Sequence, residues 1–403
     1  MSVLSTACSA STIQNSNPLQ QSNPINFKEC ISQLKPQAIA SGVKDEVYEK
    51  YTKDLVADHS LIEKQNYQPE FSTPIWDYLS GLVDKERIDQ GKEQLKYHEQ
   101  TLKKIEDTYG VPPEVVVAVW GVESNFGTNL GKYSLIQSLS TLSCEGRRQN
   151  YFKGEFFATL RILQSGDLTE NQLRGSWAGA FGQTQFMPST YEKLAVDFDG
   201  DGRRDLVSNK ADALASTANY LKQAGWQKGL PWGFEVNVPS NFIFDNESRR
   251  NKKPLSEWFT RGVTRAKGGS LIQGNLSNST PAGLFMPAGK EGPKFLVFSN
   301  FDAIYRYNAA ESYALAIAYL SDQISGGYKI VAAWPTDDPG VSRNERIEIQ
   351  RYLISKGYDI GAADGLLGVK TREAISKEQE KMGLKVTGHA GQIFLNKIRS
   401  LNK

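Results

Sequence analysis

A glutamate at the end of an apolar segment is the residue of this sequence best suited to acid–base chemistry. Glu123 follows the run Val115–Trp120, which is apolar on every face of a helix and is therefore expected to be buried. Burial disfavours a charged carboxylate, and a carboxyl that stays protonated near neutral pH can act as a general acid in glycosidic cleavage. Gly121 and Gly127 leave room for another group to approach the backbone. From spacing alone, the alternative is a buried glutamate in an ion pair or at a helix cap.

An aspartate-rich segment indicates a cation site. Asp197–Asp205 fits the first nine positions of an EF-hand loop, with carboxylates at positions 1, 3, 5 and 9 and glycine at position 6. Ser208 stands where the usual closing glutamate would be, and Asp212 follows four residues later. The alternative is a solvated turn without an ion. The predicted metal-binding residues are Asp197, Asp199, Asp201, Arg203, Asp205 and Asp212.

These residues lie in a chain of 403 residues whose pattern changes along its length. Residues 26–331 are mainly helical, but a small strand-rich insert with near-alternating apolar residues is expected from Leu230 to Phe301. The proline- and aspartate-containing segment 332–341 is typical of a linker, across which few contacts are expected. Residues 342–403 contain three short helical patterns and form a second predicted domain.

The first 25 residues and the three cysteines give information about the cell compartment in which the protein works. Residues 1–25 are mostly small and polar, which predicts a disordered or processed tether. Small residues precede Cys8, as at the end of a bacterial lipoprotein signal, so Cys8 is a lipidation candidate; the alternative is an incidental cysteine. Cys30 and Cys144 then form an even pair, suited either to one disulfide in an oxidising periplasm or to two buried free thiols.

The composition excludes several classes of protein. Lys and Arg number 47 against 45 Asp and Glu, a net charge of +2, so there is no basic excess of the kind that nucleic-acid binders carry. No apolar run approaches the roughly 20 residues of a membrane-spanning helix. With three histidines and three cysteines, a His- or Cys-ligated metal centre is not expected. A monomeric globular protein is the resulting expectation.

Four motifs in order then carry a family resemblance. They are GVESNFG around Glu123, GSWAGAFGQTQFMPSTY at Gly175–Tyr191, DFDGDGRRDL at Asp197–Leu206 and YNAAESYALAIAYL at Tyr307–Leu320. Together they resemble the family B membrane-bound lytic murein transglycosylases, glycoside hydrolase family 103, over about residues 27 to 330. The resemblance implies an α+β fold in which a mainly helical, lysozyme-like catalytic domain carries the strand-rich insert.

The resemblance also implies a reaction on peptidoglycan glycan strands. Glu123 would protonate the bridging oxygen between N-acetylmuramic acid and N-acetylglucosamine, then accept the proton of the C6 hydroxyl that closes onto C1. The product is a 1,6-anhydromuramoyl end, no water is consumed, and the chemistry requires no cofactor. The calcium ion of the acidic loop would be structural.

The family motifs assign the remaining cleft residues. By motif match, the substrate-binding groups are Ser176, Gln185, Tyr220, Tyr307, Asn308 and Tyr313, with Ser176 and Gln185 near Glu123. Trp177, Phe181, Phe186 and Met187 are expected in the core. A retaining lysozyme pairs its acid with a second carboxylate about 5 Å away, whereas this family has none in that role.

The C-terminal segment resembles the three-helix peptidoglycan-binding domain of type 1, over about residues 342 to 400. Its Asp364–Gly368 turn and the Thr371–Ile375 segment match the family pattern. Glu378 stands where the family usually has Phe, so an apolar core or groove position is acidic here. An all-α C-terminal domain that anchors the enzyme to the cell wall is therefore expected.

Two other functions remain open at this point. One is a hydrolytic muramidase on the same fold, which would need a second carboxylate near Glu123. The other is a non-catalytic peptidoglycan-binding scaffold, against which the intact glutamate and all four motifs argue. The expected location is the periplasm of a Gram-negative bacterium, with a tether to the outer membrane if Cys8 is lipidated.

Overall fold

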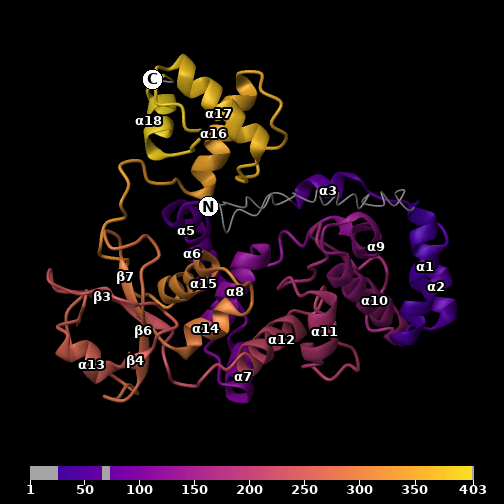
Figure 1. Cartoon of the computed structure of the whole chain (residues 1–403), viewed down its shortest axis with the longest axis horizontal. Coiled ribbons are helices and arrows are strands. Elements are labelled where there is room, and N and C mark those ends of the chain that lie inside the picture. Colours follow the sequence, from indigo (N-terminus) through magenta and orange to yellow (C-terminus); the bar gives the residue numbers. More distant parts are fainter. Residues whose placement is uncertain (1–25, 66–72, 402–403) are drawn as a thin grey trace, which may run out of the picture.

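A computed structural model of the protein describes residues 26–65 and 73–401 and confirms a mainly helical fold with a small sheet (Figure 1). The helices before the sheet are α1 (Phe27–Ala40), α2 (Asp45–Thr52), α3 (Ser60–Lys64), α5 (Ile75–Leu82), α6 (Lys85–Tyr97), α7 (Glu99–Tyr109), α8 (Pro113–Ser124), α9 (Leu135–Glu145), α10 (Gln149–Ser165), α11 (Pro188–Leu194) and α12 (Lys210–Gln223). Those within or after it are α13 (Leu255–Thr260), α14 (Ser299–Tyr305), α15 (Glu311–Ile324), α16 (Arg343–Ser355), α17 (Val369–Lys381) and α18 (Gln392–Leu401). In the described ranges, no helix is both long enough and apolar enough to cross a bilayer.

Helix α8 lies at the centre of the first core. Its residues from Val115 to Gly121 are all buried, as the continuous apolar run predicted, and α15, α6 and α12 pack around it. Pro113 stands in the first turn, where the missing N–H costs no hydrogen bond. Asn125 ends the helix in the left-handed conformation with φ 51°, and Phe126 follows with φ 56°. The chain therefore reverses sharply just after Glu123.

A second core lies beside the first and is built mainly by α1, α9 and α10. A short antiparallel pair, β1 (Tyr133–Ser134) with β2 (Arg174–Gly175), joins it to the segment that precedes α11. In this core Cys30 of α1 and Cys144 of α9 form a disulfide, with 5.9 Å between their Cα atoms. The disulfide links the first described helix to the body of the fold.

The strand-rich insert is present where the sequence predicted it. Its strands are β3 (Gly233–Asn237), β4 (Lys253–Pro254), β5 (Thr264–Arg265), β6 (Pro281–Phe285) and β7 (Lys294–Val297). They form an antiparallel sheet in the order β4-β6-β7-β3-β5, with α13 beside it at the end of the molecule distant from α1 (Figure 1). Trp258 of α13 is fully buried in the core of this insert. The chain then returns through α14 and α15 to pack against α8.

Helices α16, α17 and α18 form a separate small core after the linker. Glu378 of α17 is buried there, and its carboxylate accepts hydrogen bonds from Tyr352 Oη at 3.0 Å and Tyr358 Oη at 2.8 Å. Lys381 Nζ lies 2.8 Å from the same carboxylate. Burial alone would raise the pKa of Glu378, but these three partners lower it overall. The acidic residue is thus satisfied within the domain core.

The expectation of few contacts across the linker is wrong. Arg346 of α16 donates a hydrogen bond to the Asp77 carbonyl of α5 at 2.7 Å, and its guanidinium lies over Gly81, where a Cβ would come within 2.3 Å of it. His389 Nδ1 lies 3.3 Å from the Asp77 carboxylate. The C-terminal helices therefore sit directly on α5, as Figure 1 shows. Linker composition did not reveal this contact because it depends on residues far apart in the sequence.

The disulfide predicts a redox-dependent stability. It closes a sequence separation of 114 residues, so replacing both Cys30 and Cys144 by serine should lower the free energy of unfolding by about 2–5 kcal/mol. Thermal unfolding of the oxidised protein, with and without a reductant, measures the effect. The reductant should lower the midpoint of the wild type and leave that of the double variant unchanged. Equal midpoints for the two proteins would show that the bond does not stabilise the fold.

Candidate active site

Glu123 lies in the last turn of α8, half-buried, beside helix α15. The Tyr313 hydroxyl of α15 donates a short hydrogen bond to Glu123 Oε1. Tyr313 is 2% exposed, so the packing of α15 against α8 holds its hydroxyl in place. The contact positions the carboxylate and stabilises its charged form.

Aromatic side chains form one wall beside Glu123. Tyr307 stacks on Tyr313 with ring centroids 6.3 Å apart, and Tyr220 lies behind Tyr307 at 4.7 Å. The Tyr307 hydroxyl donates to the Thr184 carbonyl at 2.7 Å. Burial, reinforced by the negative charge of Glu123, raises the pKa of Tyr307 and of Tyr313 well above the usual range. Both hydroxyls therefore stay protonated, and that of Tyr313 remains a hydrogen-bond donor to Glu123.

A cavity of about 710 Å³ opens on one side of Glu123. Of the predicted substrate-binding residues, it brings together Ser176, Gln185, Tyr307 and Asn308. Tyr220 is not part of its lining. The Tyr220 hydroxyl donates to the Arg306 carbonyl at 2.6 Å, so this residue supports Tyr307 from behind.

The backbone around Ser176 and Gln185 fixes their side chains. Ser176 Oγ accepts a hydrogen bond from the Ala180 N–H at 3.0 Å. Gln185 has a left-handed backbone with φ 52°, and its amide donates to the Gly182 carbonyl at 2.9 Å. A non-glycine residue in that conformation is strained and is held by its surroundings.

Two residues expected in the core belong to this cavity. Trp177 and Met187 are partly buried and line it, whereas Phe181 and Phe186 are buried in the second core as predicted. Trp177 also lines a second cavity, which likewise includes Glu123. An indole at this junction offers a flat apolar face to a sugar ring.

Gln183 is a residue of the site that the sequence analysis missed. It is 6% exposed; its Oε1 accepts from Trp120 Nε1 at 2.9 Å, and its Nε2 donates to the Val207 carbonyl at 2.7 Å. Its own carbonyl accepts from Ser124 Oγ at 2.5 Å. Gln183 thus ties the end of α8 to the acidic loop, and it also fills the space beside Gly127, where a Cβ would lie 2.2 Å from its Oε1. Its partners are distant in sequence, so no local pattern could indicate this role.

The space beside Gly121 is also filled by the protein itself. A Cβ there would lie 2.7 Å from the Phe126 ring, which packs at 5.7 Å, edge to face, on Trp120. Gly121 therefore allows the chain to fold back on α8.

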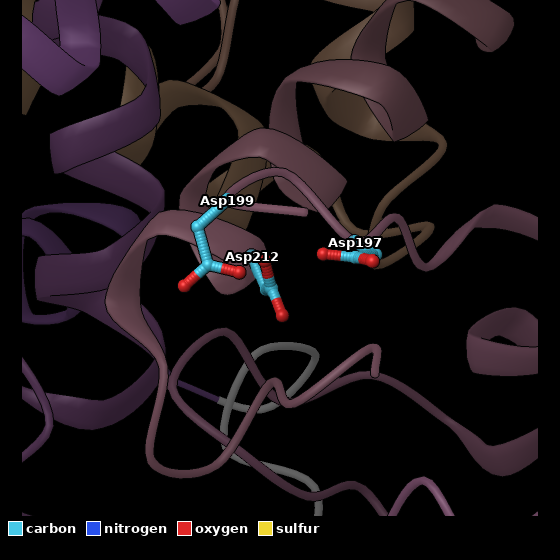
Figure 2. Close-up of side chains that lie close together, drawn as sticks. All are labelled: Asp197, Asp199 and Asp212. Atoms are coloured by element: carbon cyan, nitrogen blue, oxygen red, sulfur yellow. The ribbon is translucent and has the colours of Figure 1, made fainter. Parts of the chain in front are cut away.

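The acidic loop brings three of the predicted carboxylates together. Oxygens of Asp197, Asp199 and Asp212 lie within 4.8 Å of one another. Figure 2 shows the three side chains close together. Asp212 is fully buried in the first turn of α12, whereas Asp197 and Asp199 are exposed. Burial raises the pKa of Asp212, and the charges of Asp199 and Asp197 add to the rise. Carboxylate oxygens so arranged are the donors that Ca²⁺ prefers.

The other predicted metal-binding residues are placed differently. Asp205 is buried, and its carboxylate accepts from the Val207 and Ser208 N–H groups and from Gln172 Nε2. Asp201 lies 3.7 Å from the Arg203 guanidinium. Neither residue joins the group of three, although both lie in the loop.

A second carboxylate near Glu123 would be needed if the site used a separate nucleophile or base. Among the described residues that line the two cavities, Asp77 is the other carboxylate, and it is 7% exposed and faces His389. A buried carboxylate with that partner is poorly placed to act as a nucleophile on a sugar. Glu123 is therefore the one partly exposed carboxylate among the described residues that line the two cavities.

Comparison with known proteins gives several matches. Residues 26–322 match the family model described as Transglycosylase SLT domain, and residues 342–398 match that of Putative peptidoglycan binding domain. Membrane-bound lytic murein transglycosylase B of Escherichia coli is 32% identical over 255 residues, which are 62% of this chain and 66% of that protein, slightly under two thirds of its length.

Solved structures show the same relationship. SltB3 from Pseudomonas aeruginosa in complex with NAG-anhNAM-pentapeptide has 43% identity and a TM-score of 0.74, covering 93% of this chain and 99% of that one. Escherichia coli Slt35 in complex with calcium has 29% identity and a TM-score of 0.64, covering 73% of this chain and 92% of that one. With a family model matched over most of its length, this chain belongs to the transglycosylase SLT domain family.

Proposed function

We propose that the protein is a lytic transglycosylase that cleaves the β-1,4 bond between N-acetylmuramic acid and N-acetylglucosamine of peptidoglycan without water. The observation that carries the proposal is Glu123, held by Tyr313 between two cavities whose other described carboxylate is buried. The relatives named above support it: membrane-bound lytic murein transglycosylase B, SltB3 in complex with NAG-anhNAM-pentapeptide, and the lytic transglycosylase Slt35 in complex with calcium.

In the first step, protonated Glu123 donates its proton to the bridging oxygen, and the bond from that oxygen to C1 of the muramoyl residue breaks. The substrate's 2-acetamido group stabilises the positive charge that develops at C1. The Tyr313 hydroxyl stabilises the Glu123 carboxylate that this step leaves behind.

In the second step, the Glu123 carboxylate accepts the proton of the C6 hydroxyl, whose oxygen forms the new bond to C1. The products are a free 4-hydroxyl on N-acetylglucosamine and a 1,6-anhydromuramoyl end, and Glu123 is protonated again. Ser176, Gln185 and Asn308 would bind the sugars, while Tyr307 and Trp177 shield the site from water.

A hydrolytic muramidase is the competing reaction. It would yield a reducing end one water heavier, and it would need a base or nucleophile besides Glu123. The buried position of Asp77 disfavours this reading. The mass of the muropeptides released from sacculi distinguishes the two reactions.

The remaining expectations follow from this function. The peptidoglycan-binding match supports a role of residues 342–398 on the cell wall, and the murein substrate implies a periplasmic enzyme. Lipidation of Cys8 and the tether of residues 1–25 lie outside the described residues and stay predictions, as does the monomeric state. We also propose a structural calcium ion held by Asp197, Asp199 and Asp212.

The substitution Glu123→Gln should abolish cleavage in a folded protein, because the amide neither donates nor accepts the required proton. The expected loss of turnover is at least about 10²–10⁴-fold, the usual worth of general acid–base catalysis. Release of anhydromuropeptides from sacculi, followed by mass spectrometry, measures it. Glu114→Gln in the first turn of the same helix is the matched control and should retain activity, since Glu114 lines neither cavity. Near-normal release by the Glu123 variant would refute the assignment.

The substitution Gln183→Leu should lower kcat on the order of tenfold to a hundredfold with little change in KM, because Gln183 positions α8 without touching substrate. Gln185→Leu, which alters the cavity lining, should instead raise KM. Steady-state kinetics well below each variant's thermal midpoint give both constants. If Gln183→Leu lowered only the midpoint and left kcat intact, its role would be purely structural.

Millimolar calcium should raise the thermal midpoint, because an ion bound only to the folded state stabilises it by about 2.7 kcal/mol at 100 times its Kd. Asp199→Asn should remove the calcium-dependent rise, while Asp107→Asn, an exposed residue of α7, should keep it. Differential scanning calorimetry with calcium and with a chelator provides the comparison. A midpoint independent of calcium would favour a solvated turn.

A further inference from the structure

The second cavity beside Glu123 lies at the junction of the two parts of the chain. Its volume is about 500 Å³, and its walls come from α5 and the end of α8 on one side and from the C-terminal helices and turns on the other. It meets the first cavity at Glu123 and Trp177, which line both. Because the bond to be cleaved must lie at Glu123, substrate must extend to both sides of it. The C-terminal part of the chain thus forms a wall of the cleft itself.

This wall is positively charged. Four arginines line the junction cavity, Arg87, Arg343, Arg346 and Arg372, against two carboxylates, Asp77 and Glu123. Arg87 is paired with Asp84 at 3.7 Å, and the Asp77 charge offsets that of Arg346. Arg343 donates to the Asp364 carbonyl at 3.2 Å, and this contact holds its guanidinium without neutralising its charge. The surplus positive charge is therefore assigned to Arg343 and Arg372.

The pKa shifts of the groups at the junction agree with a surplus of positively charged side chains there. Burial lowers the pKa of the Arg346 guanidinium; Asp77 opposes this effect, and the charge of Arg372 adds to it. Burial raises the pKa of Asp77, and His389 and Arg346 oppose that rise. An anion bound beside Arg372 would offset the repulsion between the two guanidiniums.

The junction is held by direct contacts. The Gln392 N–H donates to the Pro339 carbonyl at 3.0 Å, and the Ile393 N–H to Asp338 Oδ1 at 2.8 Å, so the start of α18 is fixed to the linker. Arg346 and His389 then fix α16 and the turn before α18 to α5. The contacts to the linker and to α5 together keep the arginines at a constant place relative to Glu123.

We propose that the junction cavity binds the carboxylates of the peptide stem on the substrate's muramoyl residue, through the guanidiniums of Arg343 and Arg372. The proposal rests on the proposed function, because it assigns a binding site to a second part of the same substrate. Guanidinium groups bind carboxylates through paired hydrogen bonds, and a carboxylate-rich peptide matches the surplus charge of this wall. The C-terminal domain would thereby select stem-bearing glycan at the active site, in addition to holding the enzyme on the wall.

The test uses the full-length protein and two soluble substrates. One is glycan strands that carry peptide stems, and the other is the same strands after an amidase has removed the stems. Arg372→Gln and Arg343→Gln should each raise KM for the stem-bearing strands about tenfold, as expected for the loss of a hydrogen bond to a charged group, and leave KM for the bare strands unchanged. Arg351→Gln, an equal change of charge at an exposed site of α16, should alter neither KM.

Three results would overturn the proposal. They are an unchanged KM in both arginine variants, an equal rise on both substrates, and a rise that Arg351→Gln reproduces. An equal rise on both would place the arginines on the glycan or its lactyl carboxylate, which the amidase leaves behind. Arg372→Lys keeps the charge but not the paired geometry and should lie between wild type and Arg372→Gln. Anhydro products released by the wild type from either substrate test the proposed function separately, since that readout does not depend on the arginines.

Discussion

The site depends on a helix that is buried on all sides and yet ends in a carboxylate. Packing by α6, α12 and α15 fixes α8 in space, and the Tyr313 hydroxyl reaches Glu123 from α15. The reversal after the helix places Asn125 and Phe126 in the left-handed region, which costs on the order of 1–3 kcal/mol for each such residue. Burial of the Phe126 ring against Trp120, in the space that Gly121 leaves, offsets this cost. Strain and packing together present Glu123 to the cavities rather than to the core.

Hydrogen bonds then connect this helix end to two other parts of the chain. Gln183 joins Trp120 and Ser124 to Val207, and the carboxylate of Asp212 accepts the N–H groups of Phe198 and Asp205. The glutamate motif, the glycine-rich segment and the acidic loop are thus one connected unit. An ion in the loop would stabilise the same scaffold that holds the glutamate without taking part in the chemistry.

The C-terminal helices have a position that composition did not suggest. They lie on α5 and line one of the two cavities beside Glu123. Glu378 illustrates the same point, since its charge is buried among two tyrosines and Lys381 and contributes to the domain core. A residue that breaks a family pattern can therefore be compensated inside its own domain.

The sequence by itself determined the class of fold and the strand-rich insert, and it predicted Glu123 as the acid–base residue. Each of these was carried by a local pattern: an apolar run, near-alternation, and motifs of a few consecutive residues. It also predicted a cation site at the aspartates of the loop. Only the tertiary structure showed that Asp197, Asp199 and Asp212 come together. The carboxylates of Asp201 and Asp205 instead contact Arg203 and backbone N–H groups, because the local turns set the direction of each side chain.

The tertiary structure alone decided the position of Trp177, the link through Gln183 and the charged junction of α5 with α16. In each case the partners lie tens to hundreds of residues apart. Spacing along the chain carries no information about such pairs, and only the packing of whole helices brings them within a few ångströms.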